Sequence, residues 1–163
     1  MSATQAPSTA IAKVIVPFTH AVRQVFFKMA KVQTTVGTPH LKNQTASTYS
    51  ICGIIGFSGN VTGSVVLSFS EEAGDNLVEA FAGERHERSS ADFADAIGEL
   101  ANMVAGCAKQ QMGAGTNISL PSVVIGEKYT VAAQSMPCVV IPVTSPMGSF
   151  SVEVSIKETP AQA

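Results

Sequence analysis

Four residues in the segment ADAIGELANMVAGCAKQQM are spaced so that one helix would bring them together. Asp95, Glu99, Asn102 and Gly106 are separated by four, three and four positions, and residues three or four apart share one face of an α-helix. Carboxylates attract cations, and a carboxamide both donates and accepts hydrogen bonds. The stripe therefore either offers binding chemistry on the outward side of a helix or is an ordinary solvated helix face.

The opposite side of the same segment is apolar. Phe93, Ile97, Leu100, Val104 and Cys107 recur at helical spacing, which predicts a stripe that packs on the protein core. The polar stripe is then the side of the helix that faces outward, so its two acids and one amide are expected to be exposed rather than buried in the core.

Two glycines, Gly98 and Gly106, lie inside this predicted helix. Each costs about 1 kcal/mol of helix stability relative to alanine, and one reason to keep a glycine is the close approach of another surface. For Gly98, tight packing against the protein's own sheet explains the residue equally well. Gly106 shares the polar stripe, so we interpret it as access for a partner.

The remaining chain supplies the elements that must position this helix. We predict helices over about 9–32, over SEEAGDNLVEAFAG between a Ser70 cap and Gly83, and over about 90–113, which begins at a Ser89 or Ser90 cap and stops at Gly113. The β-rich runs are TTVGTPHLKN as a short extended piece, YSICGIIGFSG and TGSVVLSFS as a hairpin, SVVIGEKYTVA as a strand, and MPCVVIPVTS and FSVEVSIKE as a second hairpin.

This order of elements contains an internal repeat. The run FTHAVRQVFFKM aligns with FADAIGELANMV, which matches Gln24 with Glu99, and the first strands of the two hairpins align Cys52 with Cys138. Each long helix is followed by an extended piece and then by a hairpin. We predict one α+β domain over residues 1–163, in which pseudo-duplicated helix–strand–hairpin halves form an antiparallel sheet packed with the long helices. Residues of about 1–8 and 158–163 are expected to be frayed.

The composition indicates a protein with a packed core. Hydrophobic residues make up 45% of the 163 residues and charged residues 13%, with a net charge of −2, which argues against disorder, nucleic-acid binding and attraction to an anionic membrane. The apolar run AIAKVIVPF is too short to span a bilayer, and no signal peptide is recognised.

Neither the cysteines nor the histidines form a metal-binding pattern. The three cysteines lack CxxC spacing and the three histidines lie far apart. We interpret the cysteines as small buried residues in a reducing compartment, and we expect a cytoplasmic protein that contains no metal.

Charge is distributed unevenly along the chain. Residues 1–70 hold five basic residues and no acid, whereas residues 71–99 hold nine acids against two arginines. This asymmetry is explained either by two solvated faces or by an acidic surface near the polar stripe that meets a basic site on a partner.

The segment DAIGELANMVAG resembles the signature of the CheC/CheX chemotaxis phosphatases. That signature is an Asp or Ser, a Glu four positions later, an Asn three further and a proline about twenty residues beyond, which here are Asp95, Glu99, Asn102 and Pro121. The chain length and the order of elements also fit this family.

One signature helix resembles the CheX type more than the CheC type, which carries the signature twice. The equivalent positions of the first repeat are His20, Gln24 and Phe27. Because an aromatic residue stands where the Asn would be, we expect the first half to be chemically silent.

The resemblance implies a phosphatase that hydrolyses the aspartyl phosphate of a CheY-like response-regulator receiver. Asn102 would position the attacking water, and Glu99 would bind the receiver's lysine, so these two are the expected catalytic residues. Asp95 and Gly106 would contact the partner. The protein would need no cofactor of its own, because the divalent metal is expected in the receiver.

Two alternatives to the enzyme remain open at this point. The same helix could serve a non-catalytic receiver-binding module or a flagellar-switch-like interaction module. A homodimer is also possible through FSVEVSIKE as an exposed sheet edge, although Glu153 and Lys157 could instead protect that edge from pairing.

Overall fold

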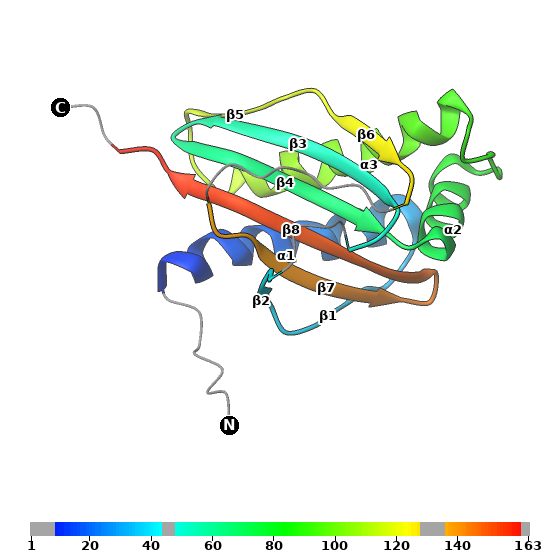
Figure 1. Cartoon of the computed structure of the whole chain (residues 1–163), viewed down its shortest axis with the longest axis horizontal. Helices are drawn as coiled ribbons and strands as arrows, with labels where there is room; N and C mark the ends of the chain where they lie inside the picture. The colour runs from blue at the N-terminus through cyan, green and yellow to red at the C-terminus, as the bar shows by residue number, and fades with distance from the viewer. Residues whose placement is uncertain (1–8, 44–47, 128–135, 161–163) are drawn as a thin grey trace.

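The computed structural model describes residues 9–43, 48–127 and 136–160, which form helices on an antiparallel sheet (Figure 1). The described helices are α1 (Thr9–Ala30), α2 (Glu71–Ala82) and α3 (Ala91–Gln110). The described strands are β1 (Thr35–Val36), β2 (His40–Leu41), β3 (Ile51–Gly59), β4 (Val61–Phe69), β5 (Thr116–Ile118), β6 (Ser122–Ile125), β7 (Val139–Ser145) and β8 (Gly148–Glu158). The predicted fold class is confirmed.

The sheet interlocks the two halves of the repeat. Its strand order is β1-β7-β8-β4-β3-β5, with β2 also on β7 and β6 also on β3. The two hairpins, β3–β4 and β7–β8, meet where β4 pairs with β8, and Val65 lies opposite Val154 there. The extended pieces that follow α1 pair with the second hairpin, and those that follow α3 pair with the first. Neither half completes its part of the sheet without the other.

The expectation that FSVEVSIKE forms an exposed edge is wrong. This segment is β8, which lies between β7 and β4, while the short strands cover both outer edges. Glu153 therefore does not protect an edge: it is buried, its Oε2 lies 2.7 Å from Lys42 Nζ, and its Oε1 accepts a hydrogen bond from Thr48. Lys157 is exposed and pairs with Thr62 of β4 alone, because the described pairing of β8 with β7 ends at Val154. An alternating pattern identifies a strand but does not name its neighbours.

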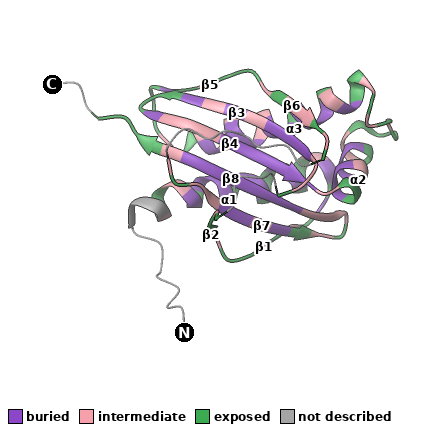
Figure 2. Ribbon diagram, viewed as in Figure 1, coloured by how far each residue is buried: buried purple, intermediate pink, exposed green. Residues whose placement is uncertain are grey.

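The core lies between the sheet and helices α1 and α3, which run side by side on one face of it (Figure 1). Figure 2 shows the long central strands largely buried. Phe18 of α1 packs edge-on against Phe57, with ring centroids 5.9 Å apart. The ring centroid of Phe150 in β8 lies 4.8 Å from that of Phe26 and 5.3 Å from that of Phe69. The predicted apolar stripe of α3 is buried at Phe93, Ile97, Leu100 and Val104, and half-buried at Cys107.

The aligned cysteines occupy equivalent positions of the repeat. Cys52 lies opposite Ser68, and its Sγ donates a hydrogen bond to Ser68 Oγ over 3.4 Å. Cys138 precedes Val139, the partner of Val154, so its backbone position faces Ser155. All three cysteines are thiols; Cys52 is buried, whereas Cys107 and Cys138 are half-buried.

Capping residues set the helix ends, largely where the sequence predicts them. Ser70 accepts a hydrogen bond from Ala73 N at the start of α2, and Gly83 ends it with a φ of 82°. Ser90 caps α3 by accepting from Phe93 N. Gly113 is not the stop of α3, which ends at Gln110, and Gly113 instead provides a φ of 85° in the turn that follows.

The first helix and the end of the last strand differ slightly from expectation. Helix α1 ends at Ala30 rather than near residue 32, and Pro17 lies inside it. Strand β8 runs through Glu158, and Thr159 N donates to Asn60 O over 2.8 Å, whereas the sequence predicts fraying from 158. The frayed ends expected at 1–8 and 161–163 lie outside the described residues. Nowhere in the described chain does a helix combine the length and apolar character needed to cross a membrane.

Candidate functional site

Helix α3 carries the four predicted site residues on its outward side. The side chains of Asp95 and Glu99 are exposed, and Asn102 and Gly106 are partly exposed. Among the described residues, none forms a hydrogen bond or ion pair with the side chains of Asp95, Glu99 or Asn102. The structure therefore brings the four residues together on one face and leaves the polar groups available to another molecule.

The two glycines of α3 have different surroundings. A Cβ on Gly98 would lie 3.2 Å from Pro121 Cγ and 3.4 Å from Val123 Cγ2, so Gly98 is explained by packing against the protein's own chain. A Cβ on Gly106 would meet nothing within 4 Å. No described neighbour therefore requires a glycine at position 106.

Pro121 supports α3 from the side. It lies between β5 and β6, the two short strands that extend along β3 and contact the helix. Its ring packs over Gly98, one helical turn before Asn102. The proline thus braces the helix against the sheet edge next to the turn that carries Glu99 and Asn102.

A groove runs along the Asp95–Glu99 side of α3 beside the end of α2. Its volume is about 460 Å³. The residues that line it are Phe81, Ala82, Glu84, His86, Asp92, Asp95, Ala96 and Glu99. The sequence indicated the acidic segment but not Phe81, because only the packing of α2 against α3 brings that residue to the groove.

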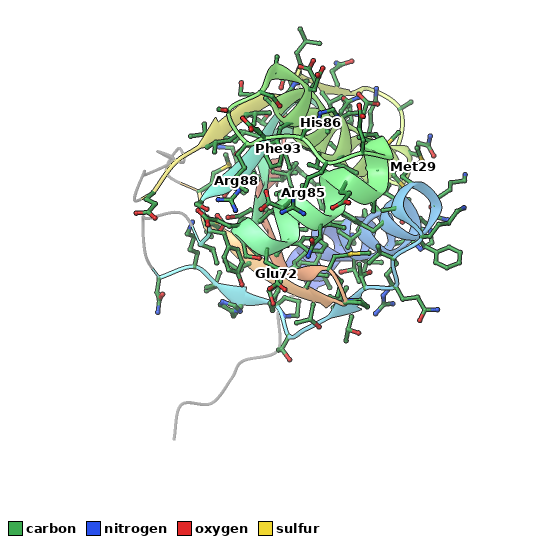
Figure 3. All side chains as sticks on the ribbon, turned by 90° about the vertical axis from the view of Figure 1, so that its right-hand side faces the viewer. Met29, Glu72, Arg85, His86, Arg88 and Phe93 are labelled. Atoms are coloured by element: carbon green, nitrogen blue, oxygen red, sulfur yellow. The ribbon has the colours of Figure 1, made fainter. Side chains whose placement is uncertain are left out.

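In the described part of the chain, arginines pair with three of the four acids of α2, and none pairs with an acid that lines the groove. Arg88 holds Asp75 through two hydrogen bonds of 2.8 and 2.7 Å, and its Nη1 lies 2.9 Å from Glu71. Arg85 binds Glu79 at 3.1 Å, and Figure 3 shows the two arginines, both in the loop that joins α2 to α3, close together. The hydrogen bond from Arg88 lowers the pKa of Asp75, and the same contact raises the pKa of Arg88.

The groove consequently carries concentrated negative charge. Asp92, Asp95 and Glu99 have no basic partner among the described residues. Glu84 has one neighbour that can become positive, since His86 Nε2 lies 3.7 Å from its Oε1. Like charges held together at a surface favour a cationic group on an incoming molecule.

The equivalent face of α1 has a different character. His20, Gln24 and Phe27 are exposed, and Phe27 is 55% exposed. Gln24 Oε1 accepts a hydrogen bond from Cys107 Sγ over 3.3 Å, so this amide is used between the two helices. Across the described ranges, no three His, Cys, Asp or Glu side chains are grouped so as to hold a metal ion.

The sequence matches the family model described as chemotaxis phosphatase CheX over residues 51–144. That range includes Asp95, Glu99, Asn102, Gly106 and Pro121. A curated relative, the CheY-P phosphatase CheX of Thermotoga maritima, is 30% identical over 104 residues, which are 61% of this chain and 67% of that protein.

Solved structures share the fold along nearly the whole chain. A chemotaxis protein CheX from Desulfovibrio desulfuricans is 27% identical with a TM-score of 0.80, and the match covers 90% of this chain and 99% of the other. A CheX–CheY–BeF3–Mg complex from Borrelia burgdorferi contains a chain that is 22% identical with a TM-score of 0.74, covering 89% and 98%. With its sequence matched over more than half its length, this chain belongs to the chemotaxis phosphatase CheX family.

Proposed function

We propose that this protein dephosphorylates the aspartyl phosphate of a CheY-like response-regulator receiver. In this proposal Asn102 positions the attacking water and Glu99 binds the receiver's lysine. Asp95 and Gly106 contact the receiver beside them. The observation that carries the proposal is the pairing of an unbonded carboxylate with an unbonded carboxamide, one turn apart, on the outward side of α3.

The reaction needs little chemistry from the phosphatase. A water oxygen attacks the phosphorus, the bond between the phosphorus and the aspartate oxygen breaks, and inorganic phosphate and a free carboxylate result. Phosphoryl transfer depends mainly on positioning and on electrostatic stabilisation. Asn102 can accept a hydrogen bond from the water through its oxygen and donate one through its nitrogen, so it can hold the water in line with the phosphorus.

Glu99 acts in this proposal as an anchor for docking. A carboxylate that pairs with the receiver's lysine would fix the position of Asn102 relative to the phosphorus, and an error of about 1 Å there costs much of the rate. The uncompensated charge of the groove beside Glu99 favours a cationic partner group. The divalent metal that neutralises the phosphoryl oxygens belongs to the receiver in this scheme.

The family relatives support this choice of substrate. The Thermotoga maritima relative is named a CheY-P phosphatase, and the Borrelia burgdorferi relative was crystallised with CheY, BeF3 and Mg. The complex shares the fold of this chain at 22% identity, so the contact residues of this chain are proposed from its own geometry.

The substitution Asn102→Ala tests the role of the amide. Phosphate release from a phosphorylated receiver should fall about a hundredfold or more in kcat, in line with loss of one positioning group, while binding of the receiver loaded with beryllium fluoride should stay unchanged. Gln110→Ala is the matched control, because it removes an exposed carboxamide two turns further along the same helix. Hydrolysis at the wild-type rate by the Asn102 variant would remove the water-positioning role.

The substitution Glu99→Ala tests the docking role separately. We expect receiver binding to weaken, with a larger loss at low salt than at high salt because the contact is ionic. Glu72→Gln serves as the control, since Glu72 is an exposed acid at the far end of α2 (Figure 3). A wild-type protein that binds receivers without releasing phosphate would instead indicate a non-catalytic binding module.

A further inference from the structure

Leu120 is the most exposed large hydrophobic residue in the described part of the chain. Its exposure is 88%, compared with 60% for Leu41 and 55% for Phe27. Single exposed leucines are common on protein surfaces. Exposure alone therefore assigns no role, and the significance of Leu120 depends on how it is held and where it lies.

The backbone on both sides of Leu120 is fixed. Ser119 N donates to Gly56 O over 2.9 Å, and Ser119 Oγ accepts from Gly56 N over 2.8 Å and donates to Leu120 O over 2.8 Å. On the other side, the ring of Pro121 packs over Gly98 of α3. The leucine side chain thus extends from a rigid support, which reduces the entropy that binding would cost.

The same contacts place Leu120 next to the proposed catalytic turn. Asn102 follows Gly98 by four residues, so it lies about 6 Å further along the same side of α3. Strands β5 and β6, which flank Leu120 in the chain, both contact α3. Figure 2 shows the connection between β5 and β6 as an exposed arc at the sheet edge.

We propose that Leu120 is an apolar docking anchor for the receiver, an inference that rests on the proposed function of Glu99 and Asn102. A specific interface covers on the order of 800 Å² per partner, a patch about 16 Å in radius, so a receiver centred on those two residues extends over Leu120. Charged contacts mainly fix register and association rate, whereas a buried apolar anchor supplies affinity. The receiver surface beside its phosphorylation site must then offer an apolar contact for this leucine.

The experiment compares two leucines in the full chain. Leu120→Ala should raise the KM for the phosphorylated receiver about tenfold, as expected for losing most of a buried leucine side chain, with kcat within about twofold. The Kd for the receiver loaded with beryllium fluoride and magnesium should rise equally. Leu41→Ala removes another exposed leucine, at the opposite sheet edge, and should change neither value.

Two further measurements identify the contact as apolar. Leu120→Met should restore affinity to within about threefold of wild type, because methionine fills a similar volume. The loss caused by Leu120→Ala should persist at high salt, unlike the loss caused by Glu99→Ala.

The outcomes separate this proposal from the one on which it rests. If Leu120→Ala binds the loaded receiver as tightly as wild type while Asn102→Ala has lost turnover, the anchor is wrong and the phosphatase proposal stands. If Leu120→Ala lowers kcat at unchanged KM and Kd, the anchor is also wrong. If the wild-type protein neither binds nor dephosphorylates any receiver tested, the phosphatase proposal itself fails.

Discussion

The substitution Gly106→Ala adds one methyl group and tests two properties, the stability of the protein and its docking to the receiver. It lies inside α3 without a positive φ, and a Cβ built on it meets nothing within 4 Å. Replacing it with alanine therefore introduces no clash within the described protein. Any cost of the added methyl group must then arise in the complex with a partner.

The expected gain in stability follows from helix propensity. Alanine is about 1 kcal/mol more favourable than glycine in a helix interior, and for a protein of this size 1 kcal/mol corresponds to a rise in Tm of about 2–4 °C. Gly98→Ala provides the contrast on the same helix. Its Cβ would lie 3.2 Å from the Pro121 ring, so we expect overpacking to cancel the gain or reverse it.

The receiver should respond in the opposite direction. If the receiver approaches the backbone at Gly106, the methyl group costs about 1 kcal/mol or more of binding free energy, which is about a fivefold rise in KM. Urea denaturation gives the free energy of unfolding, and phosphate release at several receiver concentrations gives KM and kcat. Gly126→Ala is the control, because it also adds a methyl group in open space but outside α3.

Two results would refute this reasoning in different places. If Gly106→Ala stabilises the protein but leaves KM unchanged, Gly106 is not a docking residue and the polar stripe is narrower than proposed. If the substitution destabilises the protein, the space around Gly106 is not open, and the added methyl group contacts another part of the chain. A more stable protein with a higher KM is the combination that a docking role for Gly106 requires.

Two predictions concern the ion pairs. Because Arg88 lowers the pKa of Asp75, Asp75 contributes stability above its ordinary pKa of 3.8, and this contribution is lost as the pH falls through the lower folded value. Asp75→Asn should therefore cost about 2 kcal/mol of unfolding free energy at pH 7, with a difference from wild type that shrinks below pH 3.8; a difference independent of pH would contradict the assignment. Lys42→Met should cost about 3–5 kcal/mol by leaving the buried Glu153 carboxylate unpaired. Adding Glu153→Gln should recover most of that loss in urea denaturation, and no recovery would show that the charge is not the cause.

Local patterns predicted the elements and the face of the candidate site. Helical spacing alone separates Glu99 and Asn102 from Ile97 and Leu100, because side-chain direction repeats every 3.6 residues whatever the helix packs against. Caps such as Ser70 and Ser90 act within three residues, so they too can be read from the sequence. The repeat was visible for the same reason, since each half presents the same local order.

Local sequence patterns did not predict which distant segments of the chain contact each other. Strand alternation fixes the two faces of β8 but not its neighbours, and the exchange of short strands between the halves moved it from an expected edge to the middle of the sheet. The contact of Pro121 with Gly98 and the placement of Phe81 beside Glu99 depend on the same packing. The residue pattern was enough to assign side chains to one helix face, because side-chain direction is a property of a single turn of backbone. The neighbours of that face could be known from the folded structure alone, because contacts between distant segments depend on how all the elements pack together.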